Sequence, residues 1–204
     1  MSKIALISCS KSKKPTATAA ALLYDSPLFR KSLLYGLTTC DTCYILSAKH
    51  HLIALNKIIS PYNVTLKDLS PGKKMDWGHE VLAQLKAVAK PRDEIILLAG
   101  REYHKPLDAG LRSLGLKIRL PIGDLAFGKR LQKLSELNNE VTLQRTYAEF
   151  YSVLRKLYVG QNGGRLLKEC TGKLEWPKRG IYFFLEPTEK LNTKKYAPLL
   201  QRND

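Results

Sequence analysis

Three apolar segments, each followed at once by polar and basic residues, constrain the fold of this chain more than any other feature. The segments are 4–7, 43–46 and 94–99, and they lead into SCSKSKK, SAKHHL and GREYHKPL. Short apolar runs that alternate with helical stretches are typical of a parallel sheet covered on both faces. In such sheets the loops beyond the carboxyl ends of the strands carry the chemistry. The sequence therefore predicts an open, mostly parallel α/β sheet with helices on both faces and a site at that edge.

Helices are expected between and after these strands. Residues 26–37 start with Ser26 as a cap and Pro27 in the first turn, and residues 73–89 end before Pro91. Further helices are expected at 106–114, 129–137 and 141–157, with a fourth strand at 118–122 and an irregular connection over 58–69. These elements predict an α/β domain over residues 1–158, followed by a short basic C-terminal extension over residues 159–204.

The charge of the chain predicts its class of partner. Lys plus Arg number 34 against 18 Asp plus Glu, a formal net charge of +16 that is spread along the sequence. Such a surplus is typical of proteins that bind DNA or RNA. No apolar run reaches the roughly 18 residues of a membrane span. We therefore expect a cytoplasmic protein that binds DNA or RNA, without membrane contact or an obligatory protein partner.

The four cysteines do not predict a metal site. Cys40 and Cys43 have the spacing of half a zinc site or of a redox pair, but no second pair completes either. Cys43 also begins an apolar strand, which favours a structural thiol. We expect no metal and no other cofactor.

Five separated motifs resemble a family of small uncharacterised proteins. They are SCSKSK at 8–13, LYDSPLF at 23–29, ILSAKHHL at 45–52, PYN at 61–63 and AGREY at 99–103, and the likeness covers roughly residues 3–157. This family looks akin to the YaaA-like proteins and to the lyase domain of archaeosine synthases, and it is similar in fold to uracil-DNA glycosylases. The resemblance implies a uracil-DNA-glycosylase-like fold with a nucleobase pocket, and some relatives are thought to excise modified bases from phage DNA. Two residues depart from the pattern, since His51 stands where the family usually has Gly and Asn63 where it usually has Asp.

The resemblance and the charge together predict a DNA glycosylase. Such an enzyme flips a modified base out of the duplex, here a modified pyrimidine of phage DNA, and cuts its N-glycosidic bond to leave an abasic site in antiviral defence. Base excision requires a carboxylate near the sugar and a group that protonates the leaving base. The candidate carboxylates are Asp25, Glu102 and Asp124, each beside a loop that follows a predicted strand. Asp25 comes first because it follows the loop where glycosylases of this fold keep their water-activating aspartate. His50 is the candidate acid, since histidine titrates near neutral pH.

Substrate binding is expected from aromatic, small polar and basic residues in the same loops. Tyrosines can stack on a base, hydroxyl and amide groups can contact base edges, and cations can neutralise phosphates. The candidates are Ser8, Cys9, Ser10, Lys11, Ser12, Lys13, Tyr24, Ser47, Lys49, His51, Tyr62, Asn63, Arg101 and Tyr103.

Two other classes of function stay open. One is a transferase or lyase that acts on a deazaguanine-type base in RNA, with Lys11 or Cys9 as the nucleophile. The other is a non-catalytic DNA-binding module. The tail resembles the start of a GIY-YIG nuclease domain over residues 176–184, WPKRGIYFF. Because no second Tyr-Ile-Gly and no Arg and Glu pair follow it, nuclease activity is not expected, and the tail is interpreted as a packing or DNA-contact remnant.

Overall fold

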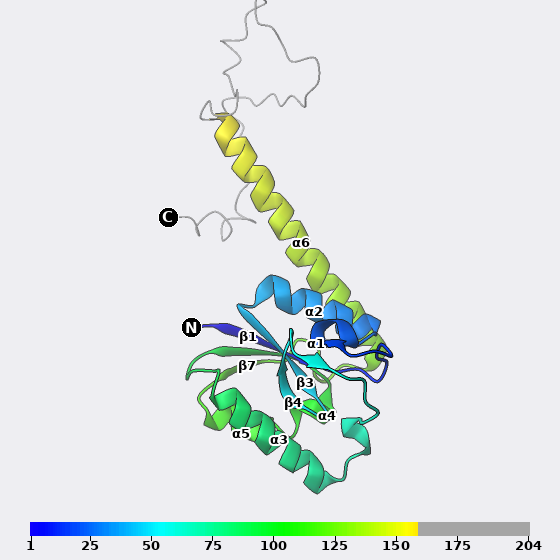
Figure 1. The fold of residues 1–204 in the computed structure, drawn as a ribbon. Helices are drawn as coiled ribbons and strands as arrows, with labels where there is room; N and C mark the ends of the chain where they lie inside the picture. Colours follow the sequence, from blue (N-terminus) through cyan, green and yellow to red (C-terminus); the bar gives the residue numbers. More distant parts are fainter. Residues whose placement is uncertain (159–204) are drawn as a thin grey trace, which may run out of the picture. The chain divides into compact units, whose positions relative to one another are not determined.

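The computed structural model describes residues 1–158, and its central element is a five-stranded sheet (Figure 1). The strand order is β4-β3-β1-β6-β7, with bounds His51–Ala54, Thr42–Ser47, Lys3–Ser8, Glu94–Leu98 and Lys117–Arg119. β1 pairs in parallel with β3 and β6, and β6 pairs in parallel with β7, whereas β4 runs antiparallel to β3. The predicted α/β architecture with a mostly parallel sheet is confirmed.

Both faces of the sheet are covered by helices, because successive strand residues point to opposite sides. Ala5 and Ile7 of β1 belong to one buried cluster, which also contains residues of α2 (Pro27–Thr39) and Leu134. Ile4 and Leu6 belong to a second cluster with α3 (Pro71–Lys86) and α5 (Asp108–Ser113). In Figure 1, α2 lies on one side of the sheet and α3 and α5 on the other. β1 is thus buried from both sides, as its continuous apolar run predicts.

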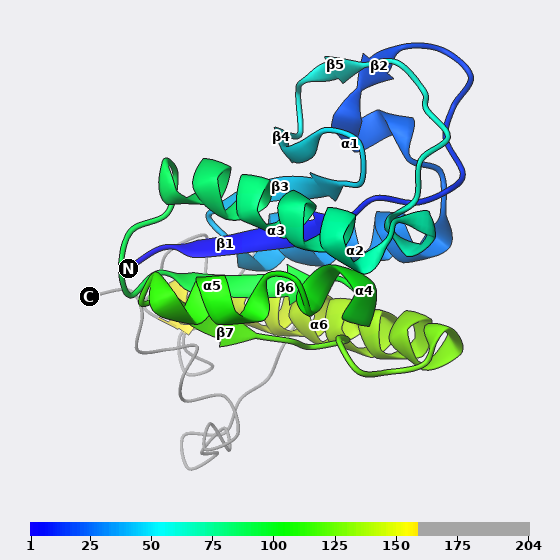
Figure 2. The same ribbon diagram turned by 90° about the horizontal axis from the view of Figure 1, so that it is seen from below.

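Short elements lie around the main sheet. β2 (Thr18–Ala19) pairs antiparallel with β5 (Ile58–Ile59), and α1 (Ala20–Leu23) follows β2 directly. η1 (Leu66–Asp68) lies in the connection that leads to α3, and α4 (Arg101–His104) follows β6. Figure 2 shows β2, β5 and α1 together, next to β4. The expected irregular connection over 58–69 therefore contains one strand and one turn of 3₁₀ helix.

Two sequence predictions about this part of the chain are wrong. The segment after β3 was expected to be a loop, but residues 48–50 form a tight turn and β4 returns along β3. The helices expected at 129–137 and 141–157 are one helix, α6 (Phe127–Tyr158). Residues 137–141 read LNNEV and contain neither Gly nor Pro, so nothing local ends the helix there.

The chain divides into two compact units, Met1–Val141 and Thr142–Asp204. Of the second unit the structure describes residues 142–158, which are helical. The expected C-terminal extension, residues 159–204, lies outside the described residues. Among the helices that are described, none has both the length and the apolar character that crossing a bilayer requires.

The amino ends of the two central strands are tied together. Asp93 accepts hydrogen bonds from the backbone N–H groups of Ser2 and Lys90, at 2.7 and 2.9 Å. Glu94 N–H donates to the Ser2 carbonyl at 2.9 Å. A single buried carboxylate thus fixes the start of β1 beside the start of β6, at the edge of the sheet opposite to the loops that carry the candidate site.

Candidate functional site

The three loops with the predicted site residues leave neighbouring strands at one edge of the sheet. β1 lies between β3 and β6, and the chain turns from β1 to α2 on one face and from β6 to α4 and α5 on the other (Figure 2). Where the loops after neighbouring strands lead to opposite faces of a parallel sheet, a ligand can reach the edge of the sheet between them. Cys9 N–H donates to the Leu46 carbonyl at 3.0 Å, which joins the first loop to β3.

Cys9 connects the first loop with the third. Its Sγ lies 3.2 Å from the Tyr103 hydroxyl, and both side chains are partly buried. Burial raises the pKa of Tyr103, and the nearby Cys9 raises it further, so the Tyr103 hydroxyl stays protonated. It can therefore act as a hydrogen-bond donor to the sulfur. The contact brings together two residues that are 94 positions apart.

Ser47, Tyr62 and Tyr24 form a hydrogen-bonded chain. The buried Ser47 Oγ accepts the backbone N–H groups of Lys49 and His50 at 3.2 and 2.9 Å. With both acceptor positions used, its own proton is directed to the Tyr62 hydroxyl at 2.8 Å, and Tyr62 lies 2.8 Å from the Tyr24 hydroxyl. Burial raises the pKa of Tyr24 to about 12 and that of Tyr62 as well. The chain is therefore neutral, and it leaves one phenol proton for another acceptor.

The Lys13 side chain is partly buried and lies against the rings of Tyr24 and Tyr62. Its ammonium donates to the carbonyls of Ser10 and Lys11 at 2.9 and 3.3 Å, and it lies 4.2 Å from the centre of the Tyr62 ring. Burial lowers the pKa of Lys13, while the neighbouring Cys9 opposes that shift. Two carbonyl acceptors and an aromatic face already satisfy this cation, so Lys13 stabilises its own loop and is poorly placed to bind a phosphate.

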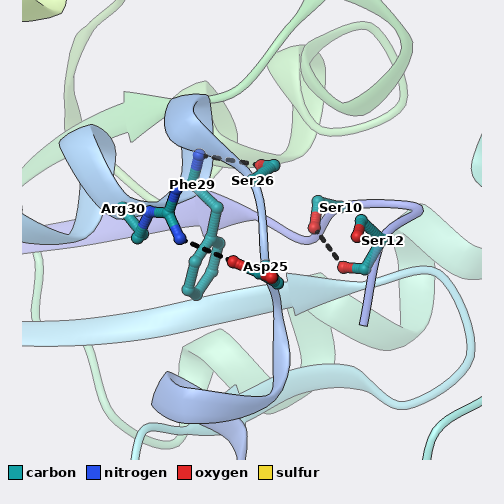
Figure 3. A network of polar contacts seen from close by, with 6 residues as sticks. All are labelled: Ser10, Ser12, Asp25, Ser26, Phe29 and Arg30. Atoms are coloured by element: carbon teal, nitrogen blue, oxygen red, sulfur yellow. Dashed lines mark hydrogen bonds and ion pairs between the residues drawn. The ribbon is translucent and has the colours of Figure 1, made fainter. Parts of the chain in front are cut away.

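The three predicted catalytic residues are directed to different partners. Asp25 is exposed and forms an ion pair with Arg30 at 2.6 Å (Figure 3), and Glu102 forms one with Lys74 at 2.6 Å. The hydrogen bond from Lys74 holds the pKa of Glu102 below its usual range. The His50 ring packs edge-on against Tyr62, with 5.2 Å between centroids. Burial lowers the pKa of His50, and the charges of Lys49 and Lys57 lower it further, so at neutral pH the ring is uncharged.

The other predicted binding residues lie around this centre. Ser10 Oγ donates to the Ser12 carbonyl at 2.8 Å and orders the first loop (Figure 3), and Ser8 Oγ lies 3.5 Å from the Leu98 carbonyl. Four others are exposed to solvent at the same edge: Lys11, Lys49, Asn63 and Arg101.

His51 adopts a backbone conformation that favours glycine. Its φ is 59°, in the left-handed region, at the point where the chain turns from β3 into β4. Glycine enters that region without steric cost, whereas a side chain such as that of His51 meets the backbone there. The His51 side chain lines a surface pocket of about 320 Å³ together with Ala48, Leu69, Lys73, Asp76, Trp77 and Glu80.

The sequence predictions missed three residues that support the site. Trp77 Nε1 donates to the Ser47 carbonyl at 2.8 Å, and its ring packs against Tyr103 with 5.6 Å between centroids. Trp77 lies four residues before Val81, so the apolar stripe of its helix could have revealed it. The Arg130 guanidinium lies against Gly100, where a Cβ would be only 2.2 Å from it, and Lys74 neutralises Glu102.

The described thiols other than Cys9 are those of Cys40, which is partly buried, and Cys43, which is buried. Burial raises the pKa of Cys43 to about 11 and raises that of Cys40. Both remain free thiols. In the part of the chain that the structure describes, no group of three His, Cys, Asp or Glu side chains is placed to hold a metal ion.

Residues 142–201 match the model of the GIY-YIG domain. This match contradicts the prediction of a DNA glycosylase, because GIY-YIG domains belong to nucleases that cleave phosphodiester bonds and not N-glycosidic bonds. The match spans the GIY motif at 180–182, where the sequence already resembles the start of such a domain. The match indicates a DNA-binding hydrolase.

The comparisons with known proteins gave one further match, to a family model that covers the first part of the chain. A search of the curated proteins found no match, and neither did a search of the solved structures. The likeness to YaaA-like proteins, archaeosine synthases and uracil-DNA glycosylases therefore stays a prediction. Residues 4–136, more than half of the chain, match a family of unknown function, DUF6884, and the protein belongs to that family.

Proposed function

We propose that this protein is a DNA-cleaving hydrolase in which residues 142–201 break the phosphodiester bond and residues 4–136 bind the DNA. The observation that carries the proposal is the GIY-YIG match. The net charge of +16 supports it, since both matched parts contain more Lys and Arg than Asp and Glu. Tyr182, the tyrosine of the GIY motif, is proposed to move a proton during the reaction.

The carboxyl edge of the sheet suits DNA binding because three cations are exposed there. Lys11, Lys49 and Arg101 are exposed beyond the ends of β1, β3 and β6. The nearby carboxylates of Asp25 and Glu102 are already paired with Arg30 and Lys74. Phosphate oxygens that approach this edge would meet cations whose neighbouring carboxylates, Asp25 and Glu102, are already paired.

Replacement of Tyr182 by phenylalanine is expected to slow DNA cleavage at least about 100-fold, the usual contribution of a group that transfers a proton. The full chain would be incubated with supercoiled plasmid DNA, with and without Mg²⁺, and nicked and linear products measured over time. DNA affinity should stay unchanged, because the substitution removes one hydroxyl and no charge.

The matched control is Tyr44→Phe, which removes a hydroxyl from β3 in the other part of the chain. It should cleave like the unmodified protein. The proposal is overturned if the unmodified protein cleaves no DNA, or if Tyr182→Phe cleaves as fast as Tyr44→Phe.

Removal of the three exposed cations at the carboxyl edge is expected to weaken DNA binding about 10- to 100-fold at low salt. The variant combines Lys11→Gln, Lys49→Gln and Arg101→Gln, and affinity would be measured by fluorescence anisotropy over a range of salt concentrations. The slope of log K against log salt should fall by about 3, since each phosphate contact contributes close to one.

A control with the same change of charge is available at the opposite edge. Lys86, Lys90 and Lys117 are exposed near the amino ends of β6 and β7, and their replacement by Gln should change the slope little. Equal losses in the two triple variants would mean that general charge, and not the carboxyl edge, binds the DNA.

A further inference from the structure

A small lobe beside the carboxyl edge is built to hold its shape. This side lobe consists of residues 18–23 and 55–59, that is β2, α1 and β5 with the turn before β5 (Figure 2). The ladder pairs Thr18 with Ile59 and Ala19 with Ile58. Ala20 N–H donates to the Lys57 carbonyl and Ala21 N–H to the Leu55 carbonyl, both at 2.9 Å. Backbone bonds thus connect both segments of the side lobe to each other.

The side lobe contains two pairs of consecutive aliphatic residues. In each pair one residue is buried in the core and the other is exposed to solvent. Leu23 is 0% exposed and Ile59 is 5% exposed, and both belong to the core cluster that contains α2. The residues just before them, Leu22 and Ile58, are 58% and 67% exposed. Packing of the side lobe on the core uses only Leu23 and Ile59. Polar residues at positions 22 and 58 would therefore be compatible with the fold.

The two outer side chains belong to the same part of the lobe. Ile58 pairs with Ala19, which caps the start of α1, and Leu22 follows Ala19 by one helical turn. The rigid backbone therefore presents two large exposed apolar groups on neighbouring elements of the side lobe.

The surroundings of these two side chains are basic. Besides Lys13, which is bound within its own loop, the segments 11–26 and 49–63 contain Lys11, Lys14, Lys49 and Lys57. Their only carboxylate, Asp25, is paired with Arg30. A protein partner with an apolar groove would not need this charge, whereas a DNA duplex combines a polyanionic backbone with apolar base faces between its steps.

We propose that Leu22 and Ile58 form a wedge that enters a DNA duplex between neighbouring base pairs and bends it. The inference rests on the proposed DNA-binding function and adds the way in which the duplex is held. Lysines on both sides fix the phosphates, and the aliphatic side chains leave water as they replace lost base stacking. Bending brings more of the duplex onto the basic edge.

The test uses the full chain and a short duplex that carries a donor and an acceptor dye at its ends. Binding of the unmodified protein is expected to raise energy transfer between the dyes, because a bend shortens their distance. The double variant Leu22→Ala, Ile58→Ala should bind about tenfold more weakly and lose the change in energy transfer, with an unaltered salt slope. Both residues are exposed, so the variant should unfold at the same temperature as the unmodified protein.

The control variant is Leu34→Ala, Leu37→Ala, which removes two aliphatic groups of similar exposure, 51% and 57%, from α2. It should bind and bend like the unmodified protein. Binding and bending by the Leu22, Ile58 variant at the level of this control overturn the wedge. An equal loss of affinity for single-stranded DNA overturns it too, because no base pairs are parted there. Binding without bending by the unmodified protein removes the wedge alone, whereas absence of any DNA binding removes the proposed function with it.

Discussion

Replacement of Ser47 by alanine is expected to lower the free energy of unfolding by about 3 kcal/mol. The Ser47 hydroxyl is fully buried, accepts two backbone N–H groups and donates to Tyr62. Alanine would leave both N–H groups without their acceptor and Tyr62 without its donor, in a region that solvent does not reach. The measurement is urea unfolding followed by tryptophan fluorescence, to which Trp77 beside Ser47 contributes.

Ser113→Ala provides the comparison. Ser113 also uses its hydroxyl on a backbone carbonyl, that of Gly110 at 2.8 Å, but it is exposed, so water replaces the lost partner. We expect a cost below about 0.5 kcal/mol there. A similar small cost at both serines would contradict the network described for Ser47.

Replacement of Gly78 by alanine is expected to destabilise the protein by about 3 kcal/mol, although alanine usually improves the interior of a helix. A Cβ at position 78 would lie 2.7 Å from the Pro106 carbonyl oxygen and 2.9 Å from Pro106 Cβ. The obstacle is backbone, so α3 and the segment after α4 would have to separate. Since Tyr103 lies in α4, its contact with Cys9 should loosen as well.

Gly72 lies in the same helix and tests the opposite case. A Cβ there meets nothing within 4 Å. Gly72→Ala should therefore stabilise the protein by about 0.5 to 1 kcal/mol through helix propensity and a less flexible unfolded chain. Thermal unfolding of both variants measures the difference, and equal effects at the two glycines would mean that α3 does not pack on Pro106 as described.

The parallel core of the fold could be predicted from the sequence because its signal is local. Apolar runs with strand length, such as 4–7 and 94–98, need no knowledge of their neighbours to be recognised. The same holds for α2, where Ser26 accepts the Phe29 N–H and Pro27 occupies the first turn.

The elements that were missed depend on a turn conformation or on pairing with a distant segment. β4 is only HLIA, and it becomes a strand because the left-handed His51 turns it back against β3. β2 and β5 are two residues each and exist only as partners of one another. Propensity carries little information about segments of this length.

For the candidate site, the position was easier to predict than the partners. Polar residues after strand ends predicted a site at the carboxyl edge, and the structure brings several of them into contact there, Cys9 with Tyr103 and Ser47 with Tyr62. The ion pairs of Asp25 with Arg30 and of Glu102 with Lys74 depend on side-chain directions that no spacing rule provides. The chemistry was predicted wrongly because the GIY-YIG likeness was given less weight than the likeness of the loops.

The tie between Ser2 and Asp93 has a practical consequence for handling the protein. β1 starts at the edge of the sheet opposite to the loops that carry the candidate site. An affinity tag or dye joined before Met1 would therefore be attached at the edge away from these loops. Protein anchored to a glass surface through such a tag would turn Lys11 and Arg101 toward the solution. A force applied to the first residues would be transmitted directly to β1. A flexible linker between the tag and Ser2 is therefore needed for force or single-molecule measurements.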